Sequence, residues 1–137
     1  RIRSVTDNDV ECINDIDQLT FDPPWQLGKT NLTAAITQSK IKKVICNDVR
    51  ILGYLLADYD NFSAHLSRIA IHPEWTGRGL ASHLMKTMLN KLHKQRVYTA
   101  SVNTQESNSA SIRLYRKFGF QPTGDKIPVY QYLQDNE

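Results

Sequence analysis

Apolar residues along this chain recur with two different periods, and the alternation between them predicts the secondary structure. Short apolar runs bounded by turn residues are typical of strands, whereas apolar positions three or four residues apart predict helices with one buried face. Strands are expected over 2–5, 43–46, 51–59, 65–72, 97–102 and 129–133. Helices are expected from Thr6 to Leu19 and over about 31–39, 79–94 and 107–118. This order predicts a single α/β (α+β) domain over 1–137, with a mixed sheet and helices on both faces.

Residues with special backbone preferences mark several of the boundaries. Thr6, followed by Asp9 three positions later, is typical of a helix N-terminus. The paired prolines at 23–24 end the first helical pattern, since proline lacks the amide hydrogen that a helix interior requires. The polar pair at 47–48 predicts a hairpin turn, and Gly119 is expected to end the last helix in a left-handed conformation.

Composition restricts the class of protein. The chain has 137 residues, of which 40% are hydrophobic, and this suffices for one domain with a core. No apolar stretch approaches the roughly 20 residues that span a bilayer. The net charge of +3 is spread along the chain, without interleaved aromatic residues to stack on bases. We therefore expect a cytoplasmic protein, without a signal peptide, that binds neither membrane nor nucleic acid.

The cysteines and histidines form no recognisable chemical motif. Cys12 and Cys46 fit neither a CxxC spacing nor a disulfide framework, and both are expected to be buried free thiols. His83 and His93 lie on one predicted helix but not one turn apart, and no cluster of cysteines or carboxylates accompanies them. No metal is expected.

The stretch 69–82 carries the first chemical signal. A β-branched run ends at Pro73, and a loop containing Gly77 and Gly79 then leads into an amphipathic helical pattern. A helix N-terminus presents unpaired amide groups and the positive end of the helix dipole, which together favour phosphate binding. Glycines without Cβ atoms would let a diphosphate approach the main chain closely. The same glycines would also serve in a simple turn, and this stretch alone does not separate the two interpretations.

A second stretch, 108–120, favours the first interpretation by resemblance. It reads Asn-Ser-Ala-Ser-Ile-Arg-Leu-Tyr-Arg-Lys-Phe-Gly-Phe and, with the glycine loop before it, resembles the GNAT superfamily of acyl-CoA-dependent N-acyltransferases. The family's Gln/Arg-x-x-Gly-x-Gly/Ala motif falls on 76–81, where Thr76 replaces the usual Gln or Arg. Its second motif, an Asn before Leu-Tyr-x-Lys-x-Gly-Phe, falls on Asn108 and 114–120.

This resemblance implies a GNAT-like fold, a mostly antiparallel sheet with splayed middle strands, and acetyl-CoA as cosubstrate. The acetyl group would pass directly to a primary amine, on a protein N-terminus, a lysine or a small molecule. The branch resembled most is that of the ribosomal-protein-alanine acetyltransferases. A backbone amide of the strand before the loop would polarise the thioester carbonyl. The cofactor-binding residues implied are Ile69, Ala70, Ile71, Thr76, Gly77, Arg78, Gly79, Leu80, Ala81, Ser82, Asn108, Ser111 and Tyr115.

The resemblance also assigns a catalytic role to Tyr115, whose hydroxyl would protonate the leaving thiolate. The alternative is an aromatic core residue with a satisfied hydroxyl. The general base stays open, because no carboxylate occupies an unambiguous position on the central strands. Glu106, His65 and Asp58 are the candidates, and a chain of water molecules without a single base is a further alternative.

The acceptor is expected beside the loop at 21–26, which borders the acceptor groove in the family. Trp25 would offer an apolar wall, or it would only anchor the loop, and Tyr130 would line the far side. The other function that we consider is a non-catalytic acyl-CoA-binding sensor or interaction domain, which Thr76 and the missing base favour and Tyr115 disfavours. The sequence does not decide between a monomer and a homodimer.

Overall fold

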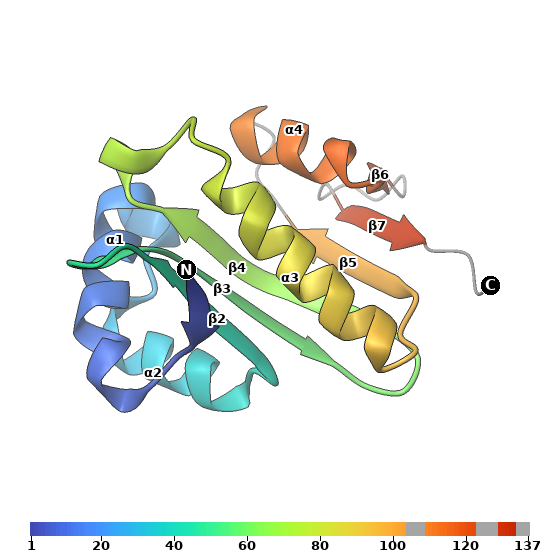
Figure 1. Cartoon of the computed structure of the whole chain (residues 1–137), viewed down its shortest axis with the longest axis horizontal. Coiled ribbons are helices and arrows are strands. Elements are labelled where there is room, and N and C mark those ends of the chain that lie inside the picture. Colours follow the sequence, from blue (N-terminus) through green and yellow to red (C-terminus); the bar gives the residue numbers. More distant parts are fainter. Residues whose placement is uncertain (104–108, 123–128, 134–137) are drawn as a thin grey trace.

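The computed structural model describes residues 1–103, 109–122 and 129–133, which form one sheet with helices on both sides (Figure 1). The strands are β1 (Ile2–Ser4), β2 (Ile41–Cys46), β3 (Ile51–Tyr59), β4 (Ala64–Ile71), β5 (Thr99–Asn103), β6 (Gln121–Pro122) and β7 (Val129–Leu133). The α-helices are α1 (Val10–Thr20), α2 (Gly28–Gln38), α3 (Leu80–Lys94) and α4 (Ser109–Lys117). The predicted elements are therefore confirmed, and β6 is an addition that the sequence pattern did not indicate.

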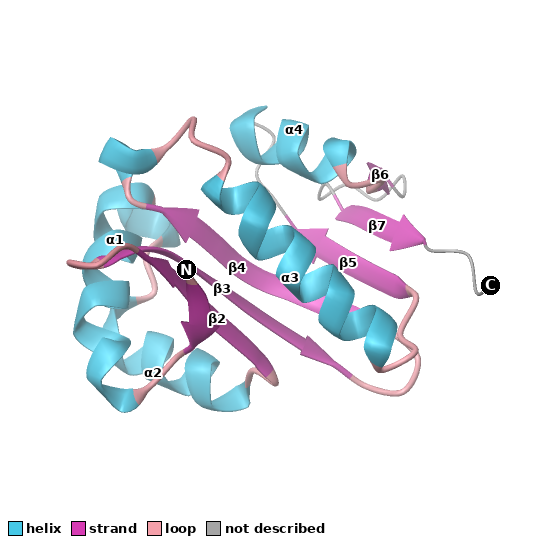
Figure 2. Ribbon diagram, in the orientation of Figure 1, coloured by secondary structure: helices cyan, strands magenta, loops and turns pink. Residues whose placement is uncertain are grey.

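The sheet has the order β1-β2-β3-β4-β5-β7-β6, and its neighbouring strands are antiparallel except for the pair β4–β5. Helices α1 and α2 cover one face, and α3 and α4 pack on the other (Figure 2). The first face buries a cluster that includes Ile13, Leu32 and Tyr54. The second buries a larger cluster that includes Leu55 and Met88. The expected mixed sheet with helices on both faces is confirmed.

The parallel pair β4–β5 opens along its length. Backbone pairing joins 64–66 of β4 to 100–102 of β5, although β4 continues to Ile71. An extra residue, Ser67, forms a β-bulge at this point, because two consecutive residues of β3 face the residues on either side of it. A bulge bends its strand and increases the local twist, so β4 turns away from β5. The splayed middle strands that the resemblance implied are present.

The strands β3 and β4 approach each other closely beyond the bulge. A Cβ atom added to Gly53 would lie 2.8 Å from the carbonyl oxygen of Ala70 and 2.5 Å from Cδ1 of Ile71. Such separations are well below van der Waals contact, so a side chain at this position would push the two strands apart. The end of β4 is therefore held firmly on its β3 side while its β5 side is open.

A few local expectations are wrong. Helix α2 begins at Gly28, about one turn earlier than the pattern suggested, because a positive φ of +75° at this glycine turns the chain into the helix. Leu19, which the apolar spacing of the first helix predicts to lie on its buried face, is exposed. Asp17 is buried instead, since polar partners from the sheet hold this carboxylate. Cys12 is exposed on the outer side of α1, while Cys46 is buried as expected. In the described ranges, no helix is long and apolar enough to cross a membrane.

Candidate active site

The loop between β4 and α3 leaves the start of the helix open. Gly77 and Gly79 take left-handed φ values of +77° and +79°, which glycine adopts without strain. Gly79 is the N-cap of α3, and the His83 amide donates to its carbonyl oxygen at 3.1 Å. The amides of 80–82 precede this first helical bond, so they point out of the helix end together with the positive end of its dipole. The loop thus has the geometry of an anion site.

A cavity of about 440 Å³ opens at this helix end. Its walls come from the end of β4, the glycine loop, the first turn of α3, one face of α4 and the C-terminus of α1. Among the predicted cofactor residues, those that line it are Ile69, Ala70, Ile71, Thr76, Gly77, Gly79, Leu80, Ala81, Ser82 and Ser111. Two motifs that lie about 30 positions apart in the sequence therefore meet in one cavity.

Arg78 is the member of the glycine loop that does not line the cavity. Its guanidinium lies over the ring of Trp75, 4.5 Å from the ring centroid, and Trp75 itself lines the cavity. Arg78 thus contacts the loop through Trp75 and not through the cavity. Thr76 donates a hydrogen bond from its hydroxyl to the carbonyl oxygen of Pro73 at 3.2 Å. The threonine that replaces the family's longer polar residue therefore forms a hydrogen bond within the loop.

Two cations on α4 contribute to the cavity, and sequence reasoning did not single them out. Arg113 and Lys117 both line it, one helical turn apart, and the ammonium of Lys117 donates to the hydroxyl of Ser82 at 3.1 Å. Their i, i+4 spacing beside Ala110 and Leu114, which also line the cavity, was the available signal. A positively charged wall facing a helix N-terminus suits a polyanionic ligand.

Tyr115 belongs to α4 but is buried in the core on the α3 side of the sheet, with only 4% of its surface exposed. Its ring packs against Phe120, with centroids 5.8 Å apart. Burial raises the pKa of the Tyr115 phenol to about 12, and a hydrogen bond with Ser111 acts in the opposite direction. Because Ser111 lines the cavity, the phenol lies one side chain away from it. The hydroxyl stays protonated at neutral pH, as a proton donor requires.

His65 lies at the paired end of β4, opposite the end that lines the cavity. Its Nδ1 is 2.9 Å from the hydroxyl of Ser101, and burial lowers the pKa of its imidazole. A strand rises about 3.3 Å per residue, so His65 is separated from Ile69 by roughly 13 Å along β4. Asp58 is paired with His65 across the β3–β4 ladder and is exposed. The structure brings neither candidate base to the cavity.

The remaining predicted residues are placed only in part. Glu106 and Asn108 lie outside the described residues. Trp25 is 52% exposed and does not line the cavity, whereas Phe21 of the same loop does. Tyr130 lies in β7, where its backbone is paired with Val102 of β5. Phe21 and Thr20 are thus the residues from the first half of the chain that line the cavity, and sequence reasoning passed over both in favour of the larger Trp25.

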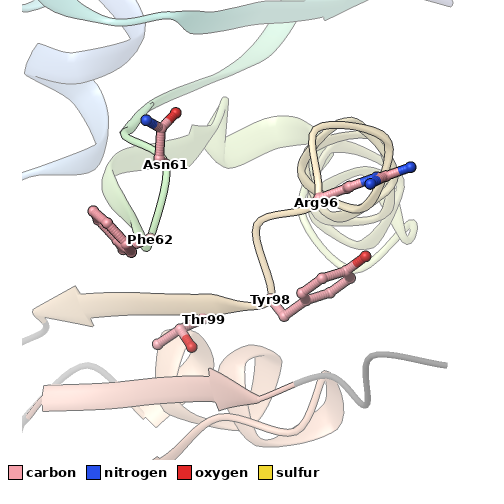
Figure 3. Close-up of a pocket in the computed structure, with 5 residues that line it drawn as sticks. All are labelled: Asn61, Phe62, Arg96, Tyr98 and Thr99. Carbon is pink, nitrogen blue, oxygen red and sulfur yellow. The ribbon is translucent and has the colours of Figure 1, made fainter.

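A second, open cavity of about 540 Å³ lies at the other end of the sheet. Figure 3 shows Asn61 and Phe62 on the turn between β3 and β4, and Arg96, Tyr98 and Thr99 on the segment that leads from α3 into β5. It contains no predicted site residue. Across the described residues, no group of three or more histidine, cysteine, aspartate or glutamate side chains is placed to hold a metal ion.

The splay between β4 and β5 beside a glycine-capped helix leaves a cavity bordered by both elements, and this arrangement fits the class of acyltransferases that the sequence resembles. The chain belongs to the Acetyltransferase (GNAT) family, whose model matches residues 11–120. It is accordingly an acetyl-CoA-dependent N-acetyltransferase, which transfers an acetyl group to an amine.

Named relatives agree with this assignment. Over 131 residues the chain is 26% identical to a putative [ribosomal protein bS18]-alanine N-acetyltransferase of Bacillus subtilis, covering 94% of this chain and 85% of that protein. Over 112 residues it is 30% identical to the [ribosomal protein bS18]-alanine N-acetyltransferase of Haemophilus influenzae, covering 82% and 75%. The PaiA N-acetyltransferase of Thermoplasma acidophilum, solved with coenzyme A, has the same fold, with a TM-score of 0.85, 16% identity and 98% coverage of both chains.

Proposed function

We propose that this enzyme acetylates the α-amine at the N-terminus of a protein, with a ribosomal protein as the acceptor class. The relatives in Bacillus subtilis and Haemophilus influenzae support this acceptor, since both are named as ribosomal-protein-alanine N-acetyltransferases, the first of them putatively. Such an acceptor would place the reaction in the cytoplasm. The structural observation that carries the proposal is the chemistry of the cavity wall. Among the described residues that line it, none is a carboxylate or a histidine.

The absence of such a side chain from the described wall favours an α-amine over a lysine. An α-amino group has a reference pKa of about 7.7–8.0, whereas that of a lysine side chain is about 10.4. A substantial fraction of α-amine is already neutral at pH 7.5, so little base assistance is needed. A lysine would require a strong, well-placed base to lose its proton at the same pH.

The cavity supports a specific placement of acetyl-CoA. Its diphosphate would lie on the amides of 80–82, beside the ammonium of Lys117, and its pantetheine arm would run along the open edge of β4. There the backbone of Ile69, Ala70 and Ile71 borders the cavity and the pairing with β5 has ended. A β4 amide near Ile71 would donate to the thioester oxygen, where negative charge develops during attack.

The transfer needs no covalent enzyme intermediate. The neutral amine attacks the thioester carbonyl carbon, the C–N bond forms, and the C–S bond breaks as the tetrahedral intermediate collapses. The amine proton leaves to solvent, and Tyr115 would supply a proton to the departing thiolate of CoA. Holding both reactants in line is the main contribution of such a site, because orientation alone lowers a barrier by several kcal/mol.

Two measurements test this proposal in sequence. Calorimetric titration of acetyl-CoA is expected to show binding that Gly79→Asp abolishes, because a carboxylate would occupy the anion site. Turnover is then compared between a peptide with a free N-terminal alanine and the same peptide with a blocked N-terminus and an internal lysine. We expect acetylation of the first only, and equal acetylation of both would overturn the α-amine proposal.

A further inference from the structure

A buried ion pair joins β4 to α1 on the face of the sheet opposite α3. Asp17 is completely buried and the side chain of Arg68 is 14% exposed, with Nε 2.5 Å from Oδ1 of the carboxylate. The hydroxyl of Tyr54 donates to the same oxygen at 2.7 Å, and the amide of Leu27 donates to the other at 3.0 Å. The carboxylate therefore accepts hydrogen bonds from two neighbouring strands, β3 and β4, and from the loop that follows α1.

The rest of the Arg68 guanidinium contacts the same loop, which we call the acceptor loop (21–27). Its Nη2 donates to the carbonyl oxygen of Trp25 at 2.5 Å. Its central carbon lies 3.8 Å from the centroid of the Phe21 ring, a stacking distance. Phe21 lines the cavity. One side chain of β4 therefore fixes the acceptor loop at two points, and Asp17 adds a third through Leu27.

The β-bulge at Ser67 explains how Arg68 comes to face α1. In a regular strand without the bulge, Arg68, two residues after Leu66, would lie on the same face as Leu66, which packs with α3. The bulge moves Arg68 to the opposite face and directs Ile69 and Ile71 to the α3 face. Arg68, which anchors the acceptor loop, therefore directly precedes the β4 residues that border the proposed thioester site, Ile69 to Ile71.

Stability alone is a weak reason for this arrangement. Removing two charges from water costs about as much as their attraction returns, and well-packed apolar replacements are often as stable. Arginine is suited to a different task, because its rigid planar group holds several partners in one geometry. Here those partners are Asp17, the Trp25 carbonyl and the Phe21 ring.

We propose that Arg68 is a positioning residue that sets the acceptor loop, and Phe21 above all, relative to the thioester end of β4. This inference rests on the proposed function, because it assigns the Phe21 end of the cavity to the acceptor amine. The cations Arg113 and Lys117 mark the cofactor phosphate end, on α4, and Phe21 enters from the C-terminus of α1. Arg68 therefore governs acceptor affinity and leaves acetyl-CoA affinity unaffected.

The test compares Arg68→Met with Arg3→Met. The control variant removes a second ion pair between an arginine and a buried aspartate, Asp9, and neither of these residues lines the cavity. Arg68→Met is expected to raise the acceptor KM at least tenfold and to change the acetyl-CoA Kd less than threefold. Arg3→Met is expected to change both less than threefold. An unchanged acceptor KM, or an equal loss of both affinities, would overturn the proposal.

A double variant guards against simple unfolding, since Arg68→Met leaves the charge of the Asp17 carboxylate without its counter-ion. Arg68→Met with Asp17→Asn removes both charges, and it is expected to bind acetyl-CoA normally while keeping the raised acceptor KM. Arg68→Lys restores one charge contact but not the planar fork, so it is expected to recover only part of the lost acceptor affinity. Full recovery by lysine would contradict the positioning role.

Hydrogen exchange separates failure of this inference from failure of the proposed function. Amide exchange within the acceptor loop is expected to be at least tenfold faster in Arg68→Met, with exchange in β2 unchanged. This readout needs no turnover, so it holds even if peptides with a free N-terminal alanine are not acetylated by the unmodified enzyme. Unchanged exchange in the loop would overturn the positioning role, whatever the acceptor is.

Discussion

The ammonium of Lys117 on α4 lies 3.1 Å from the hydroxyl of Ser82 in the first turn of α3. These residues are 35 positions apart in the sequence, and their contact joins the two helices that border the cavity. A fixed positive charge is thereby added to a helix end that already favours anions. Both side chains line the cavity, so this contact is available to a bound diphosphate.

The charge of Lys117 should therefore contribute directly to cofactor affinity. Lys117→Glu replaces an attractive charge with a repulsive one, and we expect acetyl-CoA binding to weaken at least tenfold, equivalent to about 1.4 kcal/mol or more. The measurement is calorimetric titration at two salt concentrations, because a screened charge interaction fades as ionic strength rises. Lys86→Glu, an exposed position on α3 outside the cavity lining, is the control. An equal loss in both variants would attribute the effect to net charge alone.

The glycine at the N-cap of α3 permits a second comparison with a matched control. Gly79 and Gly28 have similar positive φ values of +79° and +75°, and a Cβ atom at either would meet nothing within 4 Å. Alanine at either position should therefore cost a similar strain, about 1–2 kcal/mol. We expect both alanine variants to lower the melting temperature, but only Gly79→Ala to weaken acetyl-CoA binding. Equal binding by both variants would contradict a backbone role for Gly79.

Sequence reasoning anticipated more of the residues that line the proposed cofactor side of the cavity than of those that line its proposed acceptor side. The cofactor side is built on a loop and a helix start, where local signals such as Gly77, Gly79 and the helical period are strong. Sequence reasoning missed Arg113 and Lys117, because charged residues on a predicted helix face are usually exposed to solvent. These two side chains face a cavity only because α4 packs beside α3.

The acceptor side depends on contacts that no local pattern records. The sequence suggested Trp25 as an apolar wall, whereas the described cavity is lined by Phe21 from that loop. Phe21 is held there by Arg68, which is 47 residues away and faces α1 only because Ser67 adds a bulge. The position of a bulge follows from the pairing between strands, which no local pattern shows. Asp17 is a similar case, because it is buried in α1 only through hydrogen bonds from Tyr54 of β3 and Arg68 of β4.

His65 offers a pH-dependent test of one candidate base. Burial lowers the pKa of its imidazole, so the unfolded chain takes up a proton at about pH 6.5, where the folded protein does not. The stabilising contribution is therefore complete above about pH 6.5 and is lost as the pH falls towards the folded pKa. His65→Gln should reduce this acid sensitivity, measured by denaturant unfolding at pH 7.5 and 5.

The same variant separates a structural role from a catalytic one. His65 contacts Ser101 and does not line the cavity, so His65→Gln should change kcat/KM at pH 7.5 less than twofold. Glutamine retains hydrogen-bonding capacity towards the Ser101 hydroxyl, which limits disturbance of the β4–β5 pair. A loss of tenfold or more, confined to pH values at which the imidazole is neutral, would instead identify His65 as the general base.

Tyr115 gives the sharpest test of the chemical step. Because burial raises the pKa of its phenol to about 12, the hydroxyl is protonated throughout the range in which an α-amine becomes neutral. The rate should therefore rise with pH as the amine deprotonates and then stay level to at least pH 10, without a fall caused by Tyr115. If Tyr115 donates the proton, Tyr115→Phe should lower kcat more than tenfold and leave the acetyl-CoA Kd unchanged.

The pH dependence of stability provides the matching check on the folded protein. In the unfolded chain Tyr115 ionises near pH 10, whereas in the folded protein it ionises near 12. A group with a raised folded pKa stabilises the fold fully below its unfolded pKa, and this contribution is lost as the pH rises through the folded pKa. Unfolding free energy should thus fall between pH 10 and 12, less steeply in Tyr115→Phe. If that variant retains normal kcat while its stability depends less steeply on pH, Tyr115 is a core residue, and the thiolate takes its proton from water.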